Sequence, residues 1–96
     1  MIPRGPKQAK GILLASIRDP NLVVVFELKA LYRAAVEDVP VGDYVIDVLP
    51  LSKAEILNSG SDVTVIGYGA QMRVLAAACE KAKADDGISC DLIDLQ

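Results

Sequence analysis

The chain has 96 residues, of which 52% are hydrophobic, and its formal net charge is −3. This acidic balance argues against a nucleic-acid partner, because such proteins need a basic surface that replaces the counterions of phosphate groups. No apolar run reaches the roughly 20 residues that span a bilayer, so we expect no membrane segment. The hydrophobic share is high for a chain this short, so part of its surface is expected to be buried against more protein.

The first predicted element is a helix from Lys7 to Arg18. Its apolar residues recur at spacings of three and four, which places them on one face: Ala9, Ile12, Leu13 and Ile17. The segment Asp19-Pro20-Asn21 is predicted to end the helix, because proline disfavours helical geometry in the residue before it.

Residues 22–26 form a continuous β-branched and aromatic run that does not alternate with polar residues. This pattern predicts a strand that is buried on both faces, as in a parallel sheet covered by helices. The segment that opens at Pro40 and Gly42 has little periodicity and is predicted to be a linker.

The second half is predicted to run strand, turn, strand, helix, strand, with strands at residues 53–57, 62–67 and 89–95. The predicted helix covers residues 70–84 and is ended by Asp85-Asp86-Gly87. A right-handed crossover is expected between the last two strands. Sheets this small leave their edges unprotected, so we expect the chain to be a fragment of a larger α/β protein.

No catalytic residue can be assigned, because the chain has no histidine and no serine in a strained strand-to-helix elbow. Gly67-Tyr68-Gly69 lies between a predicted strand and helix, as a dinucleotide-binding loop would, but Met72 replaces the third glycine. The alternative is a tight turn. Cys79 and Cys90 fit no zinc pattern and are expected to be reduced thiols.

The end of the first predicted helix is the candidate metal site. The last carbonyl groups of a helix lack partners and carry partial negative charge. Asp19 and the side-chain oxygen of Asn21 lie just beyond them. Together these oxygens suit a hard cation, and the alternative is an ordinary C-terminal cap and turn.

Several segments carry a resemblance to a known family: Ile2-Pro3-Arg4, Gln8-Ala9-Lys10-Gly11, Ser16 to Asn21, FELKALYRAAVEDVP, PLSKAEILNSGSDVTVIGYGAQ and the final CDLIDL. Over nearly its whole length, the chain resembles the β subunit of the decarboxylating component of branched-chain 2-oxo acid dehydrogenase. The most discriminating part is Leu31 to Ala35 followed by Val39-Pro40. The pyruvate dehydrogenase β subunit is similar too but typically lacks this Arg-Ala-Ala continuation.

The resemblance implies an α/β fold in which two incomplete domains are joined. Residues 1–40 would be the end of a pyrimidine-binding, transketolase-like domain, residues 41–54 a linker, and residues 55–96 the start of a transketolase C-terminal domain. The family's enzyme is an α2β2 heterotetramer of the mitochondrial matrix, or of the cytoplasm in bacteria. It oxidatively decarboxylates branched 2-oxo acids in valine, leucine and isoleucine catabolism, and passes the acyl group to lipoamide on an acyltransferase core.

The resemblance places the family's cofactor-activating glutamate and active-site histidine upstream of the matched residues. The thiamine diphosphate and magnesium sites would therefore lie outside this chain, which is expected to be inactive alone. It also implies that potassium binds at Ser16, Ile17, Asp19 and Asn21 in the intact parent. The alternatives are a pyruvate dehydrogenase β subunit fragment and a non-catalytic α/β interaction module.

Overall fold

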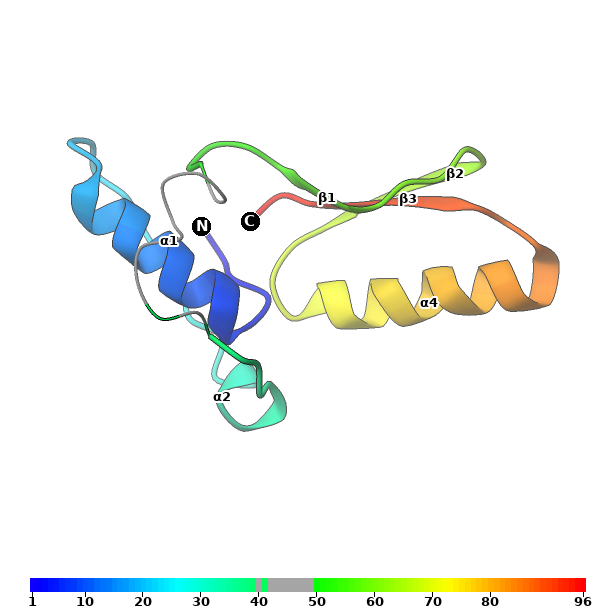
Figure 1. Cartoon of the computed structure of the whole chain (residues 1–96), viewed down its shortest axis with the longest axis horizontal. Helices are drawn as coiled ribbons and strands as arrows, with labels where there is room; N and C mark the ends of the chain where they lie inside the picture. Colours follow the sequence, from blue (N-terminus) through cyan, green and yellow to red (C-terminus); the bar gives the residue numbers. More distant parts are fainter. Residues whose placement is uncertain (40, 42–49) are drawn as a thin grey trace.

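The computed structural model describes residues 1–39, 41 and 50–96. In chain order the elements are α1 (Pro6–Arg18), α2 (Leu31–Ala34), β1 (Glu55–Asn58), β2 (Val63–Gly67), α4 (Gln71–Asp86) and β3 (Cys90–Asp94). Helices α1 and α2 lie together on one side of the molecule, and α4 and the three strands form the other side (Figure 1). Most of the predicted linker, at residues 42–49, lies outside the described residues, as does Pro40.

Helix α1 confirms the first predicted helix and begins one residue earlier, at Pro6. Proline suits the first turn of a helix, because its fixed φ is already helical and its missing N–H would be unpaired there anyway. The helix ends at Arg18. Asp19 follows as the C-cap residue, and its extended backbone (φ −75°, ψ 133°) leaves helical geometry while its N–H still bonds to the carbonyl of Ala15. Its buried face includes Gln8, Gly11 and Ile12.

The three strands form one mixed sheet in the order β1-β3-β2. Strand β2 pairs with β3 in parallel, from Val63 opposite Cys90 to Gly67 opposite Asp94. Strand β1 pairs with β3 in the antiparallel sense, with a shift of register between Ile56 and Asn58. The predicted order of elements in the second half is therefore confirmed, with each strand at or close to its expected residues.

Helix α4 covers one face of this sheet (Figure 1). Met72 and Cys79 of the helix pack with Cys90 and Leu92 of β3 in the buried core. The helix extends two residues beyond its predicted end, to Asp86, because Gly87 takes the left-handed conformation (φ 70°) that commonly ends helices.

The face of the sheet turned away from α4 carries a row of isoleucines. Ile93 lies opposite Ile56 of β1 and opposite Ile66 of β2, and successive residues of a strand point to opposite faces. Ile56 is 65% exposed and Ile66 is 57% exposed. A sheet that is apolar on both faces normally has a second layer packed on it.

The loop from β2 to α4 is a tight turn. A Cβ atom on Gly67 would come within 2.4 Å of Leu75 and 3.0 Å of the Met72 sulfur. Gly69 has a positive φ of 60°, and a Cβ there would lie 2.8 Å from both Ile2 and Leu28. Side chains of the same molecule thus pack against both glycines, which supports the tight turn over the dinucleotide-binding loop.

The predicted buried strand at residues 22–26 is wrong for this structure. The segment belongs to no sheet, and Leu22, Val24 and Phe26 are 94%, 54% and 59% exposed. Its backbone pairing within the described residues comes from Met1, which donates to the Val24 carbonyl and accepts from the Phe26 N–H. One paired residue does not make a ladder, because each further strand residue needs its own partner. Among the described residues, no helix is both long and apolar enough to cross a membrane.

Candidate functional site

The predicted cation-binding residues lie at the C-terminal end of α1, where the structure brings two of them together. The Asp19 Oδ1 atom accepts hydrogen bonds from the Asn21 backbone N–H at 2.8 Å and from the Asn21 side-chain amide at 2.9 Å. Ser16 instead donates its hydroxyl proton to the Ile12 carbonyl at 2.6 Å, within the helix. The Ile17 side chain is apolar and 72% exposed. This residue could therefore offer a cation only its main-chain oxygen.

The oxygens at this helix end partly fit a hard cation. Carbonyl groups of the last helical turn and the Asp19 carboxylate provide the oxygen ligands that such ions prefer, in the negative end of the helix dipole. No group of three or more histidine, cysteine, aspartate or glutamate side chains gathers anywhere in the described residues. The geometry is therefore that of an Asp-Asn turn following a helix, with oxygens available for an ion that has further ligands.

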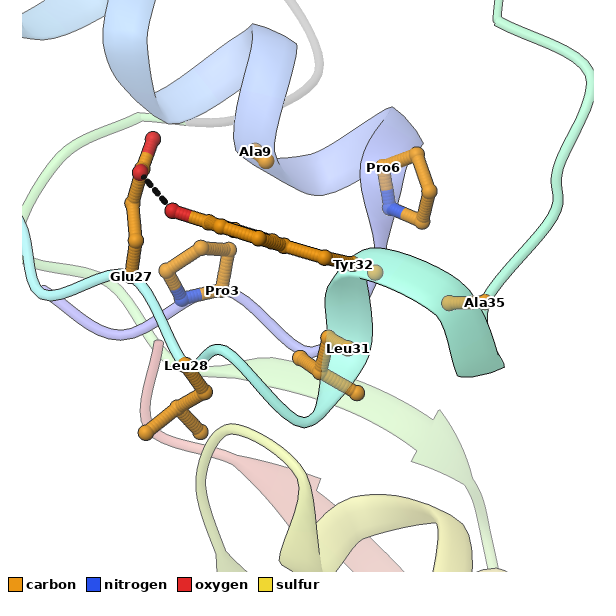
Figure 2. Close-up of a pocket in the computed structure, with 9 residues that line it drawn as sticks. Pro3, Pro6, Ala9, Glu27, Leu28, Leu31, Tyr32 and Ala35 are labelled. Carbon is orange, nitrogen blue, oxygen red and sulfur yellow. Dashed lines mark hydrogen bonds between the residues drawn. The ribbon is translucent and has the colours of Figure 1, made fainter.

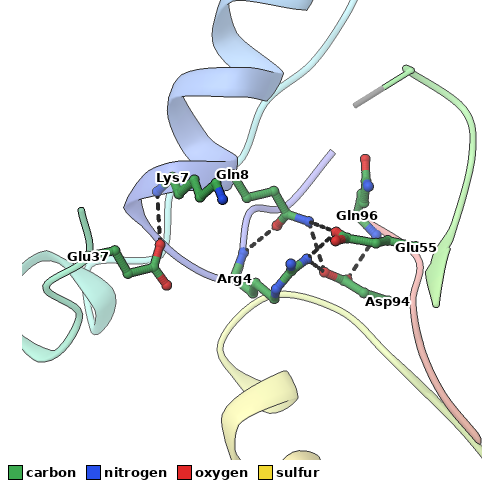
Figure 3. A network of polar contacts seen from close by, with 7 residues as sticks. All are labelled: Arg4, Lys7, Gln8, Glu37, Glu55, Asp94 and Gln96. Carbon is green, nitrogen blue, oxygen red and sulfur yellow. Dashed lines mark hydrogen bonds and ion pairs between the residues drawn. The ribbon is translucent and has the colours of Figure 1, made fainter. Parts of the chain in front are cut away.

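A polar cluster that the sequence analysis did not find joins the start of the chain to its last strand (Figure 3). Arg4 Nη1 donates to Asp94 at 2.5 Å and to Glu55 at 2.7 Å. The Gln8 side-chain amide donates to Asp94 at 2.9 Å, and its oxygen accepts the Arg4 backbone N–H at 2.8 Å. These residues come from the lead-in to α1, from α1 itself, from β1 and from β3.

The electrostatics of this cluster follow from burial. Asp94 is fully buried, and an unpaired buried carboxylate would be costly. Burial by itself would lower the pKa of Arg4, but hydrogen bonds and charges from Glu55 and Asp94 raise it above its ordinary value. Arg4 therefore stays charged at any physiological pH and neutralises the carboxylate that it contacts.

The available sequence signal for this cluster was Asp94, one of two aspartates in the predicted strand at residues 89–95. A carboxylate placed there needs a partner. The sequence did not identify that partner, because Arg4 lies 90 residues away.

A pocket of about 260 Å³ opens beside this junction, between the lead-in to α1 and the segment around α2. Its walls are mostly apolar, and they consist of Pro3, Gly5, Pro6, Ala9, Glu27, Leu28, Leu31, Tyr32 and Ala35. The Tyr32 ring extends from α2 along the pocket toward Glu27, and its hydroxyl donates to the Glu27 carboxylate at 2.5 Å (Figure 2).

The chemistry of this pocket is that of a binding surface. The hydrogen bond to Glu27 raises the pKa of Tyr32, so the phenol stays a hydrogen-bond donor to a higher pH than an ordinary tyrosine. The pocket lining includes no serine, threonine, cysteine, lysine or histidine, and its one polar pair is Tyr32 with Glu27. The residues that line this pocket thus provide apolar packing and one polar contact, from Tyr32 to Glu27.

Residues 52–96 match the transketolase C-terminal domain family. Over all 96 residues the chain is 58% identical to the mitochondrial 2-oxoisovalerate dehydrogenase subunit beta 2 of Arabidopsis thaliana, covering 26% of that protein. It is 56% identical over 96 residues to the mitochondrial 2-oxoisovalerate dehydrogenase subunit beta of Dictyostelium discoideum, covering 25% of it. The pyruvate dehydrogenase E1 component subunit beta of Acholeplasma laidlawii is 42% identical over 94 residues, which are 98% of the chain and 28% of that protein. The chain thus spans about a quarter of the length of these relatives.

Proposed function

Because residues 52–96 belong to the transketolase C-terminal domain family, we propose that the chain is the matching part of a 2-oxoisovalerate dehydrogenase β subunit. The observation that carries this proposal is the 58% identity over all 96 residues, against 42% for the pyruvate dehydrogenase relative. This difference favours branched 2-oxo acids over pyruvate as the substrates of the whole enzyme. The identity over all 96 residues also confirms the family resemblance that the sequence motifs predicted.

In this proposal the whole enzyme oxidatively decarboxylates branched 2-oxo acids and transfers the acyl group to lipoamide on an acyltransferase core. Thiamine diphosphate and magnesium bind outside the 96 residues, and an α subunit completes an α2β2 heterotetramer. The names of the Arabidopsis and Dictyostelium relatives, which include the word mitochondrial, support a mitochondrial location. Residues 1–40 form the end of the pyrimidine-binding domain, and residues 41–54 lead into the C-terminal domain.

The exposed apolar residues support a role inside a larger assembly. Leu22, Val24 and Phe26 are all more than half exposed, as are Ile56 and Ile66 on the uncovered sheet face. Exposed apolar side chains grouped in this way mark surfaces that other protein covers. The contribution of the 96 residues is then architectural: the Arg4 cluster holds the end of one domain against the sheet of the next.

The helix end at Ser16, Ile17, Asp19 and Asn21 would hold potassium in the intact subunit. Main-chain oxygens of the last helical turn and the Asp19 carboxylate would be its ligands from this chain. The supporting features are the negative end of the α1 dipole and the Asn21 hydrogen bonds that orient the Asp19 carboxylate. A bound ion would stabilise this turn by replacing the repulsion between neighbouring oxygens with attraction.

An exchange of segments tests the proposed function. The 96 residues replace the aligned segment of the Arabidopsis β subunit, which is produced together with its α subunit. Thiamine-dependent release of carbon dioxide is then measured with 2-oxoisovalerate and with pyruvate. We expect the hybrid to assemble and to retain its preference for 2-oxoisovalerate.

The matched control carries the corresponding segment of the Acholeplasma pyruvate relative, which differs more and is expected to assemble less well. An assembled hybrid that prefers pyruvate would contradict the branched-chain assignment. A hybrid that forms no complex with the α subunit, although the control does, would contradict the proposed place of these residues in the enzyme.

A further inference from the structure

Two thiols meet in the core between α4 and β3. Cys79 on the helix is 8% exposed and Cys90 on the strand is 6% exposed, and both are free. They belong to one buried cluster with Met72 and Leu92. Neither thiol has a role in the proposed function.

The chain path explains why these thiols are neighbours. Cys79 lies seven residues before the end of α4 at Asp86, which is about 10 Å of helix at 1.5 Å per residue. After Gly87 the chain reverses, and the extended residues up to Cys90 return by about 10 Å at 3.3 Å per residue. The first residue of β3 therefore lies under Cys79.

The two side chains interact. Burial raises the pKa of the Cys79 thiol, and a hydrogen bond with the Cys90 thiol raises it further. A disulfide requires Cα atoms about 4.4–6.8 Å apart, so the cross-link forms only where α4 and β3 bring the backbones at Cys79 and Cys90 within that range. The raised pKa leaves a smaller share of Cys79 as the reactive thiolate, so the oxidation runs through this minor form and becomes faster as the pH rises.

Cys79 also has a route to solvent. A pocket of about 340 Å³ lies between β1 and α4, and Cys79 lines it together with Leu57, Asn58 and Lys83. A small oxidant can therefore reach Cys79 without unfolding of the core. Cys90 is not among the residues that line this pocket.

We propose that Cys79 and Cys90 form a redox-modification site that hydrogen peroxide converts to an intramolecular disulfide. Cys79 first gives its proton to water in the pocket. The resulting thiolate attacks one peroxide oxygen, so that an S–O bond forms, the O–O bond breaks and the departing hydroxide takes up that proton to become water. The Cys90 sulfur then attacks the sulfenic acid, an S–S bond forms, the S–O bond breaks and water leaves. In total two thiols and one peroxide give one disulfide and two waters, with two electrons passing from sulfur to oxygen.

This site is independent of the proposed function and is tested on the 96-residue chain itself. The reduced protein is treated with hydrogen peroxide, and its intact mass is measured without reductant. The expected result is the loss of two hydrogen atoms, reversed by dithiothreitol. Trypsin cleaves after Lys81 and Lys83, which lie between the cysteines, so the two peptides should stay joined until reduction.

The matched variants are Cys79→Ser and Cys90→Ser. The first should show no cross-link and little oxidation, because the remaining thiol has no access to the pocket. The second should stop at a sulfenic acid on Cys79, which dimedone traps as an adduct.

The proposal is overturned if the wild-type chain only gains oxygen atoms or only forms disulfides between two molecules. Circular dichroism shows whether each variant is folded. If a variant does not fold, the tryptic map of the wild-type chain still decides, because joined peptides support the site and separately oxidised peptides refute it.

Discussion

Replacing Arg4 with alanine is expected to destabilise the chain by about 3 kcal/mol, because the buried carboxylate of Asp94 loses its charged partner. Asp94 is fully buried and lies 2.5 Å from Arg4 Nη1. Breaking one side of a buried ion pair typically costs about 3–5 kcal/mol, since the other charge stays buried. The Gln8 amide and the Gln96 backbone N–H still donate to Asp94 after the change, which favours the lower end of this range.

Glu55 adds little to this cost. Its side chain is 35% exposed, and a pair of that kind contributes about 1 kcal/mol or less. A loss of about 3 kcal/mol remains large, because small domains are stable by only about 5–15 kcal/mol. The Arg4 pair is thus expected to hold the start of the chain against β3.

Urea denaturation of the 96-residue chain, followed by circular dichroism, measures this loss. The matched control is Arg73→Ala, which removes an exposed guanidinium that donates to the Ala34 carbonyl at 2.6 Å, and it should cost about 1 kcal/mol or less. In Arg4→Ala/Asp94→Asn the buried group is no longer charged, so the double variant should lose less stability than the sum of the single changes. Equal losses for Arg4→Ala and Arg73→Ala, or strict additivity in the double variant, would refute the argument.

Three further changes test other features. Gly60→Ala should be severely destabilising in the same denaturation assay, because its Cβ would lie 2.4 Å from the backbone of Cys90. The control Gly87→Ala meets no atom within 4 Å and should cost only the roughly 1–2 kcal/mol of an alanine in the left-handed conformation. Similar losses of stability for the two variants would contradict this prediction. Because the pKa of Cys79 is raised in the folded chain, the folded chain holds the thiol proton up to a higher pH than the unfolded chain does. The stability that results is present below pH 9.0 and is lost as the pH rises further. A Cys79→Ala variant should lack this alkaline decline in stability, and the same dependence of stability on pH in the variant would argue against the prediction. In the Arabidopsis hybrid, Asp19→Ala should reduce the increase in melting temperature that potassium produces, and an unaltered increase would remove Asp19 from the proposed site.

Local signals were enough to predict most elements of the second half. The β-branched run before Gly67, the alanine-rich helix and the glycine at position 87 each specify the conformation of a few neighbouring residues. Such preferences act along the chain, so they can be found without knowing which segments meet. The same holds for α1, whose start at Pro6 and end before Pro20 depend on proline geometry.

The candidate cation site was predicted only as a set of neighbouring oxygens. The structure adds that Asn21 donates both its amide groups to Asp19 and that the Ser16 hydroxyl bonds within the helix. Which donors bond to which oxygens depends on the backbone conformation of the turn, because one oxygen can accept hydrogen bonds from several nearby donors. Potassium binding there remains a prediction.

The sequence by itself determined α1, the order of helix and strands in the second half, the match of residues 52–96 to a known family and the lack of histidine. Only the tertiary structure decided that Arg4 neutralises Asp94, that Cys79 lies over Cys90, and that residues 22–26 stay outside the sheet. The physical reason is that ion pairing, thiol contact and strand pairing each need two partners. A residue's own neighbours reveal its conformational preference, but which distant group it meets follows from how the whole chain packs.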